Sequence, residues 1–117
     1  MAVTVETLVA LLPQAWSRDS SSQWQLKNPA AGQCGVTALL VQDLLGGEIL
    51  KTRLGSAWHF YNRLDGRRHD LTESQFAAPI AYDDVATDWT DAMTDTSPRQ
   101  YAALRARALA LLAERAA

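Results

Sequence analysis

Apolar side chains recur at helical spacing in three segments of the chain. In residues 4–16, Thr4 is a suitable N-cap, and Pro13 is expected to bend or restart the helix. In residues 34–45, apolar side chains cover nearly the whole circumference, which is typical of a helix at the centre of a fold. Gly46 and Gly47 follow this second helix as C-terminal caps.

The third helical segment runs from Pro98 to about Arg115. Ser97 is the expected N-cap and Gln100 its capping-box partner. The stripe expected to be buried consists of Tyr101, Leu104, Ala108 and Leu111.

Three segments between these helices have the pattern of strands. They are residues 48–54, 57–64 and 67–71, and the last two flank Asp65-Gly66, the pair typical of a type I′ hairpin turn. Thr72 then begins a turn of helix that Phe76 anchors. The order helix, helix, strands, helix predicts a single α+β domain over residues 1–117, with a small antiparallel sheet packed on the central helix.

Two longer segments lack a regular pattern. Residues 17–31 are polar, and Trp24 is expected to be the main anchor that holds this loop against the body. Residues 77–96 carry five aspartates, which we interpret as a solvated loop with helix caps. Their spacing does not match a calcium-binding loop, so neither a metal nor another cofactor is predicted.

Composition narrows the class of protein. The 117 residues carry a net charge of −2, so no basic excess favours nucleic acid or an anionic membrane as a partner. No apolar run approaches the length of a membrane span, and the N-terminus does not have the pattern of a signal peptide. The one cysteine excludes an internal disulfide and a multi-thiolate zinc site, and it favours the reducing cytoplasm.

Cys34 lies at the start of the predicted central helix. The positive end of the helix dipole stabilises a thiolate there, so a lowered thiol pKa is expected. The backbone N–H of Cys34 is a free donor for the oxyanion of a tetrahedral intermediate. Gly32 and Gly35 are expected to leave room for a substrate.

The predicted hairpin register brings a histidine and an aspartate together. If Leu64 pairs with Arg67, His59 and Asp70 become diagonal neighbours on one face of the sheet. Such a pair supplies the base and the orienting group that a nucleophilic thiol requires. The opposite face carries apolar residues and is expected to pack on the core: Trp58, Phe60, Leu64 and Leu71.

The segments GQCGVTALLVQDLLGGEIL and WHFYNRLDGRRHDLTESQF resemble the YunG-like family of small bacterial proteins over residues 24–76. More distantly, a cysteine at a helix start, a histidine on a strand and an aspartate on the next strand resemble the papain-like and transglutaminase-like superfamily. That resemblance implies a papain-like core and a Cys-His-Asp triad for acyl transfer on an amide or ester. It also implies an oxyanion-hole amide six residues before the nucleophile, which is Asn28, with Gln33 as the rival.

Two functions remain open at this stage. One is a cysteine-dependent hydrolase or transamidase that uses Cys34, His59 and Asp70, with Trp24 and Tyr61 beside the substrate groove. The other is a non-catalytic binding or structural protein in which the cysteine is merely buried. The pattern identifies neither a particular substrate nor an oligomeric state.

Overall fold

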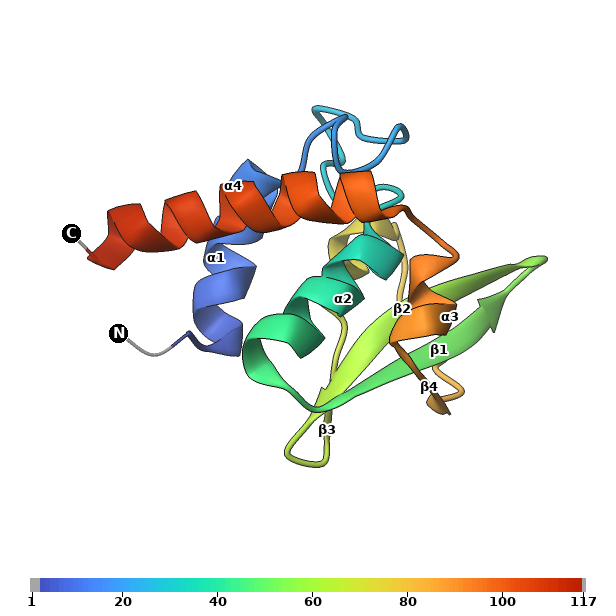
Figure 1. Ribbon diagram of the computed structural model, residues 1–117. Coiled ribbons are helices and arrows are strands. Elements are labelled where there is room, and N and C mark those ends of the chain that lie inside the picture. The colour runs from blue at the N-terminus through green and yellow to red at the C-terminus, as the bar shows by residue number, and fades with distance from the viewer. Residues whose placement is uncertain (1–2, 117) are drawn as a thin grey trace.

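Helix α2 (Cys34–Leu45) lies between a four-stranded sheet and helix α4 (Pro98–Ala116), which crosses the molecule beside α1 (Val5–Ala15) (Figure 1). This computed structural model describes residues 3–116. The remaining elements are β1 (Glu48–Leu54), β2 (Ala57–Leu64), β3 (Arg67–His69), the 3₁₀ turn η1 (Glu73–Gln75), β4 (Val85–Thr87) and α3 (Trp89–Met93). The α+β class and the central position of α2 are confirmed. None of the described helices combines the length and the apolar character that crossing a membrane requires.

The helix ends follow the sequence closely. The Thr4 hydroxyl accepts a hydrogen bond from the Thr7 N–H at 3.1 Å, and Ser97 accepts one from the Gln100 N–H at 3.2 Å. The helix does not restart at Pro13, because α1 continues to Ala15 without interruption. The helix ends soon afterwards, so the proline comes too late to divide it.

The sheet has the order β3-β2-β1-β4 and all its pairs are antiparallel. Leu64 pairs with Arg67 around Asp65-Gly66, as the turn predicts. Strand β3 nevertheless ends at His69 rather than at residue 71. It ends there because the Asp70 side chain turns back to accept hydrogen bonds from the Thr72 N–H and hydroxyl, both at 3.2 Å.

One face of the sheet packs on α2. Phe60 and Ile49 are buried there against Leu39, and the Asn62 amide donates to the Ala38 carbonyl at 3.0 Å. Trp58 departs from this pattern, because it lies near the end of the β1–β2 hairpin and is 37 % exposed. The neighbouring cations supply its packing, since the ring centroid lies 4.4 Å from Lys51 Nζ and 4.9 Å from Arg53 Cζ.

The segment of residues 77–96 is not the solvated loop that its aspartates suggest. It contains β4, which pairs with β1, and α3, which Asp88 caps by accepting from the Asp91 N–H at 2.9 Å. Before β4, it covers the second face of the sheet: Tyr82 packs on Tyr61, with ring centroids 4.9 Å apart. Asp83 accepts a hydrogen bond from Thr52 on the same face at 3.0 Å. These contacts bury His59 and Tyr61.

Candidate functional site

His59 and Asp70 form a buried pair at the end of the β2–β3 hairpin. His59 Nε2 lies 2.6 Å from Asp70 Oδ2, and the two side chains are only 3 % and 1 % exposed. The His59 ring lies between two aromatic side chains: it stacks on Tyr61 at a centroid distance of 5.8 Å and meets the edge of Phe76 at 4.9 Å. The hydrogen bond that the hairpin register predicts is therefore present, in a rigid setting.

The Asp70 carboxylate is held from several sides. Besides His59 and Thr72, it accepts a hydrogen bond from the Tyr82 hydroxyl at 2.8 Å. Burial and this contact with Asp70 raise the pKa of Tyr82 above its ordinary value, so the phenol stays a donor. Each oxygen of this carboxylate accepts two hydrogen bonds, so the saturated carboxylate fixes the orientation of the imidazole. The second ring nitrogen, Nδ1, has no hydrogen-bond partner among residues 3–116 and is not sealed from solvent.

Cys34 begins α2, as predicted, and is partly buried. Its thiol donates a hydrogen bond to Asp95 Oδ2 at 3.4 Å, and the same oxygen accepts from the Gly35 N–H at 3.0 Å. Within residues 3–116 the thiol makes no hydrogen bond to His59. The hydrogen-bond partner of the thiol is thus a carboxylate and not the imidazole of the predicted triad.

The thiol pKa moves opposite to expectation. Burial first, and then the charge of Asp95, raise the pKa of Cys34 to about 12, against the lowering effects of the Phe60 and Gly35 backbone donors. The prediction of a lowered pKa was wrong because it counted only the helix dipole. Burial also raises the pKa of Asp95, opposed by its hydrogen bonds with Cys34 and Gly35 and by the charge of His59.

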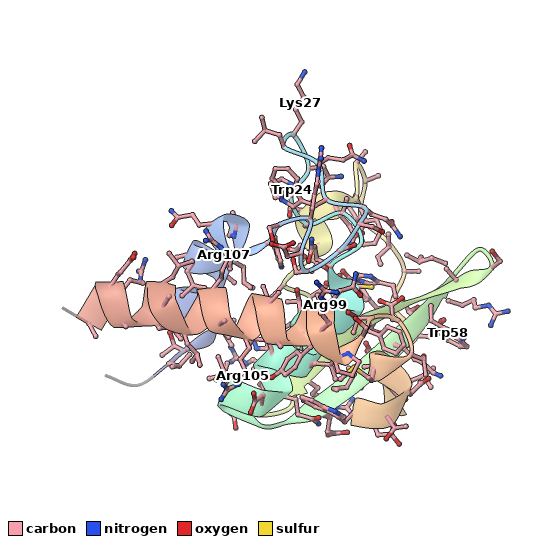
Figure 2. The ribbon with its side chains drawn as sticks, turned by 45° about the horizontal axis from the view of Figure 1, so that its top comes forward. Trp24, Lys27, Trp58, Arg99, Arg105 and Arg107 are labelled. Atoms are coloured by element: carbon pink, nitrogen blue, oxygen red, sulfur yellow. The ribbon has the colours of Figure 1, made fainter. Side chains whose placement is uncertain are left out.

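Cys34, His59 and Asp95 line one cavity of about 410 Å³. Its walls come from the loop before α2, from the turn end of the β1–β2 hairpin, from η1, and from the link between α3 and α4 with the start of α4. Figure 2 shows Trp58 on the hairpin side of the molecule and Arg99 near the start of α4. The other lining residues are mostly polar and uncharged: Ser20, Ser21, Ser22, Gln23, Gly32, Leu54, Ala57, Trp58, Gln75, Phe76, Thr94, Thr96 and Gln100.

Neither candidate for an oxyanion-hole side chain faces this cavity. Asn28 donates its amide to the Gln75 carbonyl at 3.2 Å. Gln33 is fully buried: it accepts from the Ser20 hydroxyl at 2.8 Å and donates to the Ser17 carbonyl at 3.3 Å. Among the described residues that line the cavity, neither Asn28 nor Gln33 is found. Both amides instead fix the loop of residues 17–31.

The two aromatic residues expected beside the groove lie elsewhere. Tyr61 is 1 % exposed and donates its hydroxyl to Asp84 at 3.0 Å, behind His59. Trp24 packs against the helical core and helps to hold its loop, while Lys27 points away from the body (Figure 2). Buried Ser20, bonded to Gln33, is an anchor of this loop that the sequence did not suggest.

The space into which a side chain would project from either glycine is occupied by the protein, although Gly32 also lines the cavity. A Cβ at Gly32 would lie 2.6 Å from the Ser21 hydroxyl oxygen, and a Cβ at Gly35 would lie 2.7 Å from Asp95 Cβ. Both glycines therefore admit close approach, but of the chain's own side chains. Asp95 is the site residue that sequence reasoning missed: it was grouped with the five loop aspartates, and its position next to a helix cap gave no sign of Cys34.

No group of three or more metal-ligating side chains occurs in the part of the chain that the structure describes. The three titratable residues that line the cavity, Cys34, His59 and Asp95, are instead a possible nucleophile, a base and an acid. Such a set can move a proton and form a thioester.

Comparison with known proteins identifies the family. The family model described as YunG protein matches residues 4–113. The chain is 48 % identical over 101 residues to the protein called Uncharacterized protein YunG from Bacillus subtilis (strain 168), covering 86 % of this chain and 88 % of that one. No solved structure matches. The match over nearly the whole length establishes that the chain belongs to the YunG family.

Proposed function

We propose that this protein is a cysteine-dependent acyl-transfer enzyme that acts on an amide or ester. The observation that carries the proposal is the buried His59–Asp70 pair on the wall of the cavity that also contains Cys34. A histidine held by a saturated carboxylate, with Nδ1 free and a thiol in the same cavity, supplies the base, the orienting group and the nucleophile that this chemistry uses.

The reaction proceeds in two steps. The Cys34 sulfur bonds to the substrate carbonyl carbon while the thiol proton passes to His59 Nδ1. Collapse of the tetrahedral adduct breaks the bond to the amine or alcohol, which leaves with that proton, and a thioester remains. Water, or an acceptor amine, then attacks the thioester, gives a proton to His59 and releases the acyl product with the thiol restored.

Asp70 holds the imidazole in one orientation and stabilises its charged form during both steps. The proposal includes a papain-like or transglutaminase-like core, since the cysteine begins the central helix, the histidine lies on β2 and the aspartate directly follows the neighbouring strand β3. It also favours a reducing compartment such as the cytoplasm, because the nucleophile must remain a free thiol.

The raised thiol pKa favours the second candidate, a non-catalytic binding protein that uses the same cavity. In that case Cys34 would stay a thiol and the His59–Asp70 pair would serve only the fold. The two functions differ in whether His59 controls the chemistry of the sulfur.

Acylation by p-nitrophenyl acetate tests the proposal. We expect release of nitrophenolate together with an acetyl group on Cys34, detected by intact-protein mass. Cys34→Ser should abolish the adduct, and His59→Gln should slow its formation by about a hundredfold or more. The matched control is His69→Gln, the other histidine of the chain, on β3. Equal acylation rates in the two histidine variants would contradict the enzyme and favour the binding protein.

A further inference from the structure

One carboxylate oxygen lies between the proposed nucleophile and the amide that follows it. The N–H groups of the first turn of α2 have no partner within the helix, and the Gly35 N–H instead donates to Asp95 Oδ2 at 3.0 Å. The Cys34 thiol donates to the same oxygen at 3.4 Å. Asp95 thus places a negatively charged oxygen at the start of the helix, beside the sulfur.

An acyl-transfer reaction generates an oxyanion in the same neighbourhood. When the Cys34 sulfur bonds to a carbonyl carbon, the carbonyl oxygen becomes negative within reach of the backbone donors at the helix start. The amide groups of Asn28 and Gln33 are bonded to Gln75, Ser17 and Ser20 and do not line the cavity. With these two amides occupied elsewhere, the backbone N–H groups at the start of α2 are the donors that lie beside the sulfur.

We propose that the Gly35 N–H is the oxyanion donor of this site, and that Asp95 is its displaceable occupant in the resting protein, holding Cys34 as a thiol until a substrate carbonyl takes its place. This inference rests on the proposed acyl-transfer function. It assigns to Asp95 a gating role and to Gly35 a catalytic one.

The residue at position 35 is suited to this contact. A Cβ there would lie 2.7 Å from Asp95 Cβ, a distance that Cβ atoms do not adopt, so only glycine lets the carboxylate dock. Glycine is a poor helix former, and Gly35 is buried within α2. Glycine at this position thus lowers helix propensity but allows the Asp95 carboxylate to contact the backbone.

The surroundings permit an exchange of occupants. Asp95 belongs to the link of residues 94–97 between α3 and α4, so its side chain can leave without moving α2. Of the described residues that line the cavity, only Cys34, His59 and Asp95 titrate. When a neutral carbonyl oxygen replaces the carboxylate at Gly35, the thiol loses its acceptor and the negative charge beside it, and its proton can pass to His59.

Two reagents test separately the two roles of Asp95 in this gate, which are to hold the thiol and to occupy the Gly35 N–H. Iodoacetamide alkylates the thiolate without forming an oxyanion, whereas p-nitrophenyl acetate forms one. Asp95→Asn removes the charge but keeps an oxygen that can accept from the Gly35 N–H, and we expect alkylation to rise by about tenfold or more, with a lower thiol pKa in the rate profile. Asp95→Ala also uncovers Gly35, so acylation should rise by a further factor of about ten beyond alkylation.

Asp88→Asn is the matched control. It removes one negative charge from the same segment and leaves the α3 cap intact, because asparagine caps as well as aspartate, so neither rate should change. Gly35→Ala provides a second route, since its Cβ should expel Asp95 and raise alkylation as Asp95→Ala does. If an Asp95 variant fails to fold, Gly35→Ala still tests whether displacing Asp95 releases the thiol.

Each outcome decides one part of the inference. An unchanged alkylation profile in Asp95→Asn and Gly35→Ala would overturn the gate. Alkylation and acylation that rise by equal factors in Asp95→Ala would overturn the assignment of Gly35 as the oxyanion donor. Failure of the enzyme itself is distinct, because His59→Gln would then acylate as fast as the His69→Gln control, whatever the Asp95 variants do.

Discussion

Two aspartates of the same cavity region hold its two reactive side chains in different ways. Asp70 is 1 % exposed and accepts hydrogen bonds from His59, Tyr82 and Thr72. Asp95 belongs to a link between helices, and its polar contacts are the Cys34 thiol and the Gly35 N–H. The first arrangement fixes an imidazole permanently, whereas the second holds a thiol by contacts that a ligand oxygen can replace.

The two aspartates show how one site can hold its base rigidly and keep its nucleophile in a resting contact. A base must keep its orientation through the reaction, so its partner belongs to the packed sheet. A nucleophile that forms a covalent bond must give up its resting contact, so that contact is better placed on a link. The predictions below test whether the two carboxylates differ in this way.

Asp70→Asn should have the largest effect on stability. The carboxamide would bring an N–H₂ group toward donors that now converge on the carboxylate, leaving buried polar groups without partners. We expect the free energy of unfolding to fall by about 3 kcal/mol. Urea denaturation measures it, with Asp83→Asn on the same sheet face as a more exposed comparison. If Asp70→Asn changed the free energy of unfolding by as little as Asp95→Asn does, the distinction between the two aspartates would be lost.

Gln33→Ala should have the second-largest effect on the free energy of unfolding. The variant deletes a fully buried amide that joins the Ser20 hydroxyl and the Ser17 carbonyl, and it should cost about 2 kcal/mol. Because Gln33 acts on the loop and does not line the cavity, the alkylation rate of Cys34 per folded molecule should be unchanged. A lower acylation rate at unchanged stability would instead restore Gln33 as an oxyanion donor.

The hairpin half of the site was predictable because it is local. Asp65-Gly66 sets a two-residue turn, and the alternation of strand residues then places His59 and Asp70, eleven residues apart, on one face. The bounds of α2 follow equally from its apolar residues and from the glycines after it. In these segments a short-range pattern determines the structure.

The Cys34–Asp95 contact was not predictable for the opposite reason. The two residues are sixty-one positions apart and meet through the packing of α3 beside α2. The burial of the helix start also depends on this packing, and burial is the largest of the effects that raise the thiol pKa. The short strand β4 escaped notice because three residues are too few for an alternating pattern to stand out.

Alkaline pH should destabilise the protein through Cys34. Its pKa is about 12 in the folded chain and near 9.0 when unperturbed, so between these values the folded state retains a proton that the unfolded state releases. Stability therefore falls as pH rises above 9.0, by at most about 1.4 kcal/mol per pH unit. In Cys34→Ser this slope should be absent between about pH 9 and about pH 10, below the pKa of tyrosine in the unfolded chain, as chemical denaturation over this interval would show.

The smallest effect concerns the pH dependence of Asp95. Burial raises its pKa in the folded state, so the folded chain binds this proton more tightly than the unfolded chain does. The stability that Asp95 contributes is thus present at acidic pH and is lost as pH rises through its folded pKa. Asp95→Asn cannot ionise, and relative to the natural chain it should gain stability, by less than about 1 kcal/mol, between about pH 4 and about pH 7.

Asp84→Asn should change stability in the opposite direction to Asp95→Asn. The Arg68 guanidinium holds the pKa of Asp84 below its ordinary value, so its contribution is present at neutral pH and lost on acidification. Relative to the natural chain, Asp84→Asn should therefore lose stability over the range in which Asp95→Asn gains it. If both variants shifted in the same direction, Asp95 would be a stabilising ion in the resting fold, and a substrate carbonyl would have no reason to displace it.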